Sequence, residues 1–268
     1  MSSSETIRSL ERGLQVLRAM TDNPISSLHD IYQQTGISKP SLLRILQTLE
    51  HSGFVSRRLA DGRYRICANL SRLARKRDHY DAVAEAAAPV LDRLCQKVSW
   101  PSDMMVPAGD HMEVRESSRM VTPVYFALQR VGTPINWVLS AVGRAYLAAC
   151  PEKEREKVLT PLRKSDKLEN RLARDTKRFE RILAETRARG YATRDPSFVG
   201  GAYGSQVPDG LAGIAVPLLD RGRVHGAINI IWVKAARSLD DMVRDHLADV
   251  RAAAAEIVGS LREQERRA

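Results

Sequence analysis

The sequence contains little cysteine. Its three cysteines, Cys67, Cys95 and Cys150, lie far apart and have neither CxxC spacing nor an adjacent histidine. This distribution argues against a disulfide framework and against a zinc site, and it is typical of buried thiols in a reducing compartment. The six histidines are scattered without metal-ligand spacing. We therefore expect no metal and no cofactor.

Long apolar runs and catalytic motifs are also missing. No stretch approaches the ~20 residues that a membrane-spanning helix needs, and residues 1–5 lack the basic start and apolar core of a signal peptide. The motifs GxSxG, GxGxxG and HExxH and the Walker loop are absent. We therefore expect a cytoplasmic protein that is not an enzyme.

The composition is otherwise that of a folded protein. Hydrophobic residues make up 43% and charged residues 28% of the 268 residues. This length exceeds one typical domain of ~100–150 residues, so two domains are expected. The formal net charge is +10, and arginines are concentrated in residues 57–65 and 72–77. Such a surface suits a polyanionic partner, although an ordinary solvated surface also explains a charge run.

The first part of the chain has the pattern of three helices. Apolar residues recur at helical spacing over residues 6–21. Ser26 or Ser27 can cap a second, short helix that ends at Gly36, because glycine readily adopts a left-handed turn. Ser38 can cap a third helix. Two helices joined by a tight glycine turn are therefore expected.

A basic hairpin is expected after the third helix. Two β-type runs, residues 54–58 and 63–66, flank Asp61-Gly62, which favours a tight turn. Three helices followed by a hairpin, in this order, are typical of a winged helix-turn-helix, and we assign residues 1–68 to such a domain. The second helix of its helix-turn-helix pair would enter the major groove of DNA.

The third helix and the hairpin carry the candidate DNA contacts. Arg44 is best placed for a base contact, since its planar guanidinium can bond guanine O6 and N7 together. Lys39 and Ser41 suit phosphates. The arginines of the hairpin can enter the minor groove or follow phosphates, and the sequence does not choose between these. The candidate DNA-binding residues are Lys39, Pro40, Ser41, Arg44, Gln47, Arg57, Arg58, Arg63 and Arg65.

The rest of the chain mixes helices and strands. A long linker helix is expected over residues 69–88, ending or kinking at Pro89. Residues 89–268 contain short apolar runs bounded by Gly and Pro, which favour an α+β domain with an antiparallel sheet. Strands are expected at 103–106, 112–116, 124–129, 213–219 and 225–233, and helices at 140–149, 151–163, 170–189 and 238–266.

Several motifs resemble those of the IclR family of transcription regulators over nearly the full chain. Residues 9–14 resemble its opening helix and residues 38–49 its recognition helix. Further landmarks follow in the family's order: Val131-Gly132-Thr133-Pro134, Gly143-Arg144-Ala145, Arg189-Gly190-Tyr191 and Gly213-Ile214-Ala215-Val216-Pro217. The resemblance implies a ligand-responsive regulator with an N-terminal winged helix-turn-helix, a linker helix and a C-terminal GAF-like effector-binding domain. It also implies a homodimer or homotetramer on a double-stranded DNA operator.

The resemblance also implies where a small-molecule effector binds. The pocket would be bounded by the loop before Gly143, the segment at Gly213 and the strand that carries Asn229. The candidate effector-binding residues are Trp137, Ser140, Ala141, Asp195, Gly213, Asn229 and Ile231. Arg144 replaces the usual lysine of the family signature. Gly213 stands where many members have cysteine, which would leave room for a larger ring.

Strand alternation gives Asn229 a particular place among these residues. It lies on the same side of its strand as Ala227 and Ile231, and it is the sole polar group of an apolar run. Its amide must bond either to the protein backbone or to an arriving ligand. A carboxylate on that ligand would need a partner, which stays open among Arg115, Arg130, Arg144 and Arg194.

Three short motifs resemble the subgroup that activates 3-(3-hydroxyphenyl)propionate catabolism: residues 98–103, 114–116 and 227–230. This resemblance implies an aromatic carboxylic acid as effector. Two other classes stay open: an enzyme that acts on a small acid and carries a nucleic-acid-binding module, and a constitutive architectural DNA binder. Turnover of aromatic acids would indicate the first, and a lack of ligand-dependent thermal protection the second.

Overall fold

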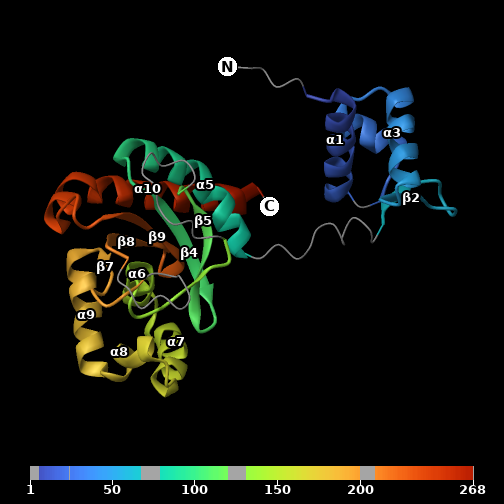
Figure 1. Ribbon diagram of the computed structural model, residues 1–268. Helices are drawn as coiled ribbons and strands as arrows, with labels where there is room; N and C mark the ends of the chain where they lie inside the picture. Colours follow the sequence, from blue (N-terminus) through green and yellow to red (C-terminus); the bar gives the residue numbers. More distant parts are fainter. Residues whose placement is uncertain (1–5, 24, 68–78, 120–130, 200–208, 268) are drawn as a thin grey trace. The chain divides into compact units, whose positions relative to one another are not determined.

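The computed structural model describes residues 6–23, 25–67, 79–119, 131–199 and 209–267 (Figure 1). Internal contacts divide the chain into two compact units, residues 1–77 and 78–268, and each is described by itself. The expected strand at 124–129 and residues 69–78 of the expected linker helix lie outside the described residues. The domain limits placed at residues 68 and 88 stay predictions.

The N-terminal unit combines three helices with a small antiparallel sheet. Its helices are α1 (Arg8–Asp22), α2 (Leu28–Thr35) and α3 (Lys39–His51). The strands β1 (Ile25–Ser26), β2 (Val55–Arg57) and β3 (Tyr64–Ile66) pair in the order β1-β3-β2. Strand β1 was not expected from the sequence. One apolar core holds these elements together, with Val16, Met20, Ile31, Leu42 and Leu46 fully buried.

Local hydrogen bonds explain where the helices of this unit begin and end. Ser27 and Asp30 form a capping box: the Ser27 hydroxyl accepts from the Asp30 N–H, and the Asp30 carboxylate accepts from the Ser27 N–H. Gly36 ends α2 with φ of 66°, as a tight turn requires. Ser38 precedes α3 but its side chain does not cap it, contrary to expectation. Its hydroxyl donates to Ser41 Oγ instead.

The C-terminal unit is built on a six-stranded antiparallel sheet with the order β6-β5-β4-β9-β8-β7. The strands are β4 (Ser102–Ala108), β5 (His111–Ser117), β6 (Pro134–Ile135), β7 (Ala192–Thr193), β8 (Leu211–Asp220) and β9 (Arg223–Val233). The helices are α5 (His79–Val98), α6 (Ala141–Ala149), α7 (Glu152–Lys164), α8 (Arg171–Arg174), α9 (Thr176–Arg189) and α10 (Leu239–Arg267), with a short 3-10 turn η1 (Leu168–Asn170) before α8.

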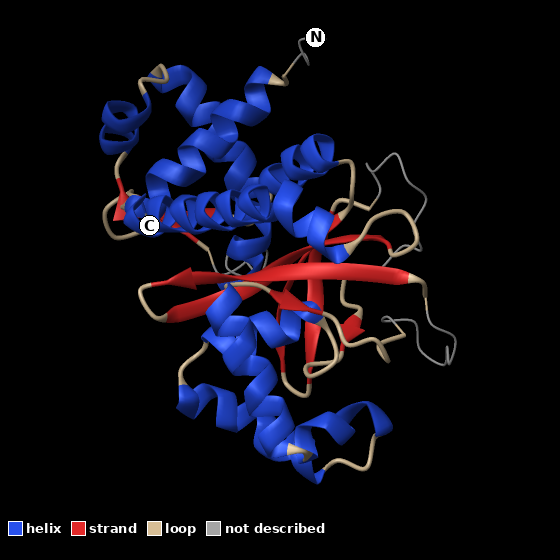
Figure 2. Ribbon diagram, turned by 90° about the vertical axis from the view of Figure 1, so that its left-hand side faces the viewer, coloured by secondary structure: helices blue, strands red, loops and turns tan. Residues whose placement is uncertain are grey.

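Helices cover both faces of this sheet (Figure 2). Helices α5 and α10 pack on one face, with a core that includes Ile228, Ile230 and Trp232 of β9. Helices α6 and α9 contribute to the core on the other face, which includes Ala215 of β8 and Ala227 of β9. The expected alternation along β9 is therefore confirmed, and the sheet separates two apolar cores.

Two helix predictions were wrong. Pro89 does not end a helix, because α5 runs through it from His79 to Val98. Burial of the flanking turns, including Ala87 and Val90, compensates for the backbone hydrogen bond that proline cannot make. The helix expected over 170–189 is divided at Asp175, whose carboxylate accepts from the Arg178 N–H and caps α9.

Among the described residues, no helix is both long and apolar enough to cross a membrane.

Candidate functional site

The outward face of α3 carries the predicted base-reading residues. Leu42 and Leu46 are fully buried, so helical periodicity turns Arg44, midway between them, outward. Arg44 and Gln47 are exposed, and in the part of the chain that the structure describes neither side chain has a hydrogen bond or ion pair. Arg44 therefore presents an uncommitted guanidinium at the position where a base contact was predicted.

The N-terminal turn of α3 carries the predicted phosphate contacts. Lys39 and Pro40 are exposed, whereas Ser41 is half-buried and bonded to the Ser38 hydroxyl at 3.0 Å. The Lys39 ammonium lies 5.8 Å from the centre of the Tyr32 ring, which holds it beside α2. A helix N-terminus with backbone N–H groups and a nearby cation is suited to binding phosphate.

The wing formed by β2 and β3 holds its arginines by different contacts. Arg57 and Arg65 each donate an Nε hydrogen bond to an acceptor within the wing, at 3.1 and 3.0 Å. Arg58 lies 3.4 Å from the Asp61 carboxylate. Arg63 is exposed. All four predicted arginines thus lie on one short hairpin, which gives this edge of the N-terminal unit a concentrated positive charge.

The predicted effector residues before α6 shape the start of that helix. Ser140 caps α6, since its hydroxyl accepts from the Gly143 N–H at 3.0 Å. Trp137 is fully buried and donates to the Gly109 carbonyl at 3.2 Å. A Cβ at Gly143 would lie 2.1 Å from the Trp137 carbonyl oxygen, so this close approach requires glycine. Ala141 is buried in the same core.

Asp195 is paired with Arg144 at 2.6 Å. Arg144 is only 4% exposed and also donates to the carbonyl oxygens of Val138 at 2.7 Å and Thr193 at 3.1 Å. Burial raises the pKa of Asp195, but hydrogen bonds from Ser197 and Arg144 outweigh it and leave this pKa below its ordinary value. The guanidinium of Arg144 is therefore committed to the protein's own acceptors.

Asn229 lies on the side of the sheet that faces α6, and it is 5% exposed. Its side-chain oxygen accepts from the Asp103 N–H of the neighbouring strand at 2.8 Å. Within the described residues its amide nitrogen has no hydrogen-bond partner. The backbone therefore satisfies only half of this amide, and an N–H donor remains for an acceptor on a ligand.

Gly213 and Ile231 are paired across β8 and β9. A Cβ at Gly213 would lie 3.2 Å from the Ile230 carbonyl oxygen, which is a tight approach, and 3.7 Å from Ile231 Cγ1 and 4.0 Å from Arg194 Cδ. The Arg194 guanidinium is paired with Asp209 at 2.8 Å and lies 4.8 Å from the centre of the Phe198 ring. The Arg194 side chain therefore starts beside the predicted effector residues Gly213 and Ile231 and is held at its end by Asp209 and Phe198.

The sequence did not single out a buried ion pair beside Asn229. Arg119 and Asp103 are joined by two hydrogen bonds of 3.0 and 2.9 Å, and their side chains are 3% and 0% exposed. Ser117 donates to the same carboxylate at 2.7 Å. An aspartate at the start of an apolar strand is the signal that could have indicated a buried partner.

Arg115 and Arg130 are the remaining candidate partners for a ligand carboxylate. Arg115 is paired with Glu113 at 2.7 Å and with Asp81 at 3.1 Å. Arg130 lies outside the described residues. Every arginine considered for this role that the structure describes therefore already has an acidic partner.

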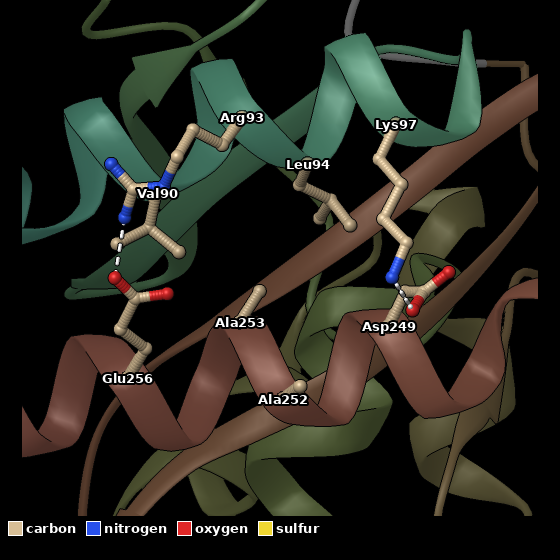
Figure 3. A pocket seen from close by; sticks show the side chains of 8 residues that line it. All are labelled: Val90, Arg93, Leu94, Lys97, Asp249, Ala252, Ala253 and Glu256. Atoms are coloured by element: carbon tan, nitrogen blue, oxygen red, sulfur yellow. Dashed lines mark hydrogen bonds and ion pairs between the residues drawn. The ribbon is translucent and has the colours of Figure 1, made fainter.

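The pocket in Figure 3 lies between α5 and α10, on the sheet face opposite α6, and has a volume of about 160 Å³. Ion pairs link its two sides, Arg93 to Glu256 and Lys97 to Asp249. No predicted effector residue lines it. Its lining residues are Val90, Arg93, Leu94, Lys97, Asp249, Ala252, Ala253 and Glu256. We interpret it as the seam of two packed helices.

Comparison with known families decides the identity of the chain. Residues 9–59 match the model described as IclR helix-turn-helix domain, and residues 78–258 match the model described as bacterial transcriptional regulator IclR C-terminal. The chain belongs to the IclR family. It is a DNA-binding transcription regulator, and the families that it matches are regulators rather than enzymes.

Individual IclR-type relatives agree with this assignment. The glycerol operon regulatory protein of Streptomyces coelicolor is 29% identical over 245 residues, which are 85% of each chain. The crystal structure of Thermotoga maritima IclR matches with a TM-score of 0.54 and 20% identity, over 96% of this chain and 99% of that chain. An IclR homologue from Microbacterium hydrocarbonoxydans, complexed with 4-hydroxybenzoate, matches with a TM-score of 0.52 and 21% identity, over 95% and 99%. The expected fold class is confirmed.

Proposed function

We propose that this IclR-family regulator controls genes of aromatic-acid catabolism and responds to an aromatic carboxylic acid such as 3-(3-hydroxyphenyl)propionate. The effector would bind on the sheet face that α6 covers, at the residues predicted from the sequence. The homologue from Microbacterium hydrocarbonoxydans, which binds 4-hydroxybenzoate, supports this class of ligand. A regulator of this kind acts on chromosomal DNA, and we place it in the cytoplasm.

The observation that carries the proposal is the half-satisfied amide of Asn229. Its oxygen is held by the Asp103 N–H, so the amide nitrogen is the group left to bind. An N–H donor that has no partner within the protein selects for a ligand that brings an acceptor. A hydroxyl or carboxylate oxygen on an aromatic ring supplies that acceptor while the ring covers the apolar surface.

The DNA-binding part of the proposal assigns different tasks to α3 and the wing. Arg44 reads a guanine in the major groove, and the N-terminal turn of α3 binds phosphate. The wing arginines increase affinity for every sequence because they neutralise backbone charge.

Recognition of two half-sites requires two copies of the chain, so we propose a homodimer or a homotetramer. Ile7, Leu10 and Leu14 of the N-terminal unit are 67%, 58% and 52% exposed and recur at spacings of three and four residues. This spacing aligns them along one side of a helix, as in a helix pair. We propose that the same stripe of a second copy covers them.

The direct test is calorimetric titration of the purified protein with 4-hydroxybenzoate and with 3-(3-hydroxyphenyl)propionate. Binding of at least one acid, together with a changed affinity for the operator, is expected. The unfolding temperature should rise with the concentration of the acid. Absence of binding by both acids would overturn the effector class, and turnover of either acid would indicate an enzyme instead.

A further inference from the structure

The arginines considered as carboxylate partners that the structure describes, and Arg119 beside Asn229, are each paired with an acid. The pairs are Arg144 with Asp195, Arg119 with Asp103, Arg115 with Glu113 and Arg194 with Asp209. A carboxylate that enters the site therefore meets cations already neutralised by the protein. It binds strongly only if it replaces one of these aspartates or glutamates at its arginine.

The buried pairs are poor candidates for such an exchange. Asp103 has no exposed surface and is also held by Ser117, so displacing it would leave a charge without solvent or partner. Arg144 is fixed by two backbone carbonyls besides Asp195, whose side chain is 15% exposed. Replacing either partner would disrupt a network that the fold itself uses. Arg115 is paired with Asp81 of α5, which packs on the sheet face opposite α6, so this pair lies away from the candidate site.

Asp209 differs from Asp103 and Asp195 because its side chain is more exposed. Its side chain is 26% exposed, and it meets Arg194 through a single nitrogen, Nη2, at 2.8 and 3.0 Å. It also accepts from the N–H of Leu211, at 3.1 Å. A displaced Asp209 carboxylate can be hydrated, so the exchange does not leave a buried charge.

The guanidinium of Arg194 is also well placed and oriented. Its Cδ lies 4.0 Å from the position of a Cβ at Gly213, beside Ile231. The Phe198 ring stacks under it, and Nη2 donates to the Phe198 carbonyl at 2.9 Å. These contacts hold the plane of the guanidinium, and a preoriented fork loses little entropy when it binds a carboxylate.

We propose that Arg194 binds the carboxylate of an aromatic hydroxy acid and that Asp209 occupies this position in the unliganded protein. The inference rests on the proposed function and names the carboxylate partner within it. Asn229 lies on β9 and Arg194 directly follows β7, two strands away. Asn229 is in register with Ala215 and Ala192, so Arg194 lies two strands across and two residues along from it. A strand spacing of about 4.8 Å and a rise of about 3.3 Å per residue put the two backbones about 12 Å apart, a distance that the side chains and the ligand span together. The hydroxyl of the ligand faces Asn229 and its carboxylate faces Arg194.

The test compares an acid with its neutral amide. 4-Hydroxybenzoate, 4-hydroxybenzamide and 3-(3-hydroxyphenyl)propionate are titrated by calorimetry into the wild type, Arg194→Gln and Asp209→Asn. The wild type prefers the acid over the amide. Arg194→Gln weakens binding of the acids by about tenfold or more and leaves the amide nearly unchanged. Asp209→Asn strengthens binding of the acids because it removes the competing carboxylate.

A surface variant serves as control. Arg163→Gln removes an arginine whose ion pair with Glu156 lies on α7, away from the candidate site, and it leaves both affinities unchanged. If Arg194→Gln fails to fold, Asp209→Asn decides alone: tighter binding of the acid supports the proposal and unchanged binding overturns it. If the wild type binds the acids but neither variant alters the preference, Arg194 is not the partner and the proposed function stands. If the wild type binds neither acid, the proposed effector class itself fails.

Discussion

Side chains on the face of the sheet toward α6 have structural tasks and, in our proposal, binding tasks. Asn229 orients its amide with one hydrogen bond from Asp103, and that bond leaves the donor in a fixed direction. Arg144, by contrast, uses its guanidinium to join the start of α6 to the segment at Thr193. We thus propose that polar side chains serve the fold at Arg144 and recognition at Asn229, and their hydrogen-bond partners distinguish the two roles.

Asn229→Leu should abolish effector binding and leave basal affinity for DNA intact. Leucine fills a similar volume but offers no donor, and it also leaves the Asp103 N–H without an acceptor. We therefore expect a loss of stability of ~1–3 kcal/mol as well. Calorimetry with 4-hydroxybenzoate measures binding, and urea unfolding measures stability. Wild-type affinity for the acid in this variant would refute the assignment of Asn229.

Arg44→Ala should remove specific operator binding. Removing one bidentate pair of hydrogen bonds to guanine costs about 1–3 kcal/mol, whereas binding to random DNA should fall much less. Fluorescence anisotropy on both DNAs measures the difference. Arg18→Ala, an exposed arginine of α1, is the matched control. Equal reductions on operator and random DNA would reassign Arg44 to a phosphate contact.

Features of the secondary-structure elements that depend on neighbouring residues could be predicted from the sequence, whereas features that depend on contacts distant in the sequence could not. Ser27, Gly36 and the basic hairpin depend on hydrogen bonds or dihedral angles within a few residues, so their spacing in the sequence reveals them. Pro89 was misread because burial of α5 against the sheet outweighs the local cost of proline. The arginine partners at the candidate site could not be predicted, since pairing such as that of Arg194 and Asp209 depends on how separate strands meet.

The wing is the element whose charge should act without sequence preference. Replacing Arg57, Arg58, Arg63 and Arg65 by Gln should weaken binding to all DNA and flatten its salt dependence, by about one counterion for each phosphate that the variant no longer neutralises. Titrations at several salt concentrations give this slope. Circular dichroism verifies that the N-terminal unit remains folded. An unchanged slope in a folded variant would show that the wing does not contact DNA.

A histidine pair joins the first turn of α5 to β9. His79 Nε2 and His225 Nδ1 lie 2.8 Å apart, so one ring donates and the other must accept. Burial lowers the pKa of His225, and the charges of His79 and Arg223 lower it further, against opposing effects of Asp220 and Glu265. The folded protein thus favours neutral His225, whereas the unfolded chain binds the proton more readily.

This difference predicts a pH-dependent stability of the C-terminal unit. The contribution of neutral His225 to the free energy of unfolding is complete above the ordinary histidine pKa of 6.5. It is lost as the pH falls through the lower pKa of the folded state. Between about pH 7.5 and about pH 5.5, His225→Gln should therefore lose less unfolding free energy than the wild type. Urea unfolding measures both slopes, with His111→Gln as control. Equal slopes in His225→Gln and the wild type would contradict the role of the pair.

For the whole molecule, regulation requires that two units of the chain affect one another. The matched family regions, residues 9–59 and 78–258, belong to the two compact units. A ligand shifts the DNA-binding state only by its difference in affinity for two arrangements of the protein. In our proposal, exchange of Asp209 for a ligand carboxylate at Arg194 would be a contact that differs between such arrangements, and assembly of two chains would multiply its effect on the operator.

The last prediction therefore concerns assembly. The double variant Leu10→Glu and Leu14→Glu places charges on the exposed stripe of α1, while its buried residues Val16 and Met20 keep the N-terminal unit folded. Repulsion between two such stripes should abolish the dimer of N-terminal units, which anisotropy detects as a loss of affinity for an operator with two half-sites. Affinity for a single half-site should change little, because one unit binds it alone.

Single half-site binding separates this effect from simple repulsion between the new glutamates and DNA, which would weaken both DNAs equally. Leu168→Glu with Leu219→Glu alters two exposed leucines of the C-terminal unit and serves as the matched control. The full chain is used for both measurements, and the ratio of its affinities for the operator with two half-sites and for the single half-site measures the contribution of the stripe. An unchanged ratio in the α1 variant would mean that another surface pairs the DNA-binding units, and the exposed stripe would then need a different partner.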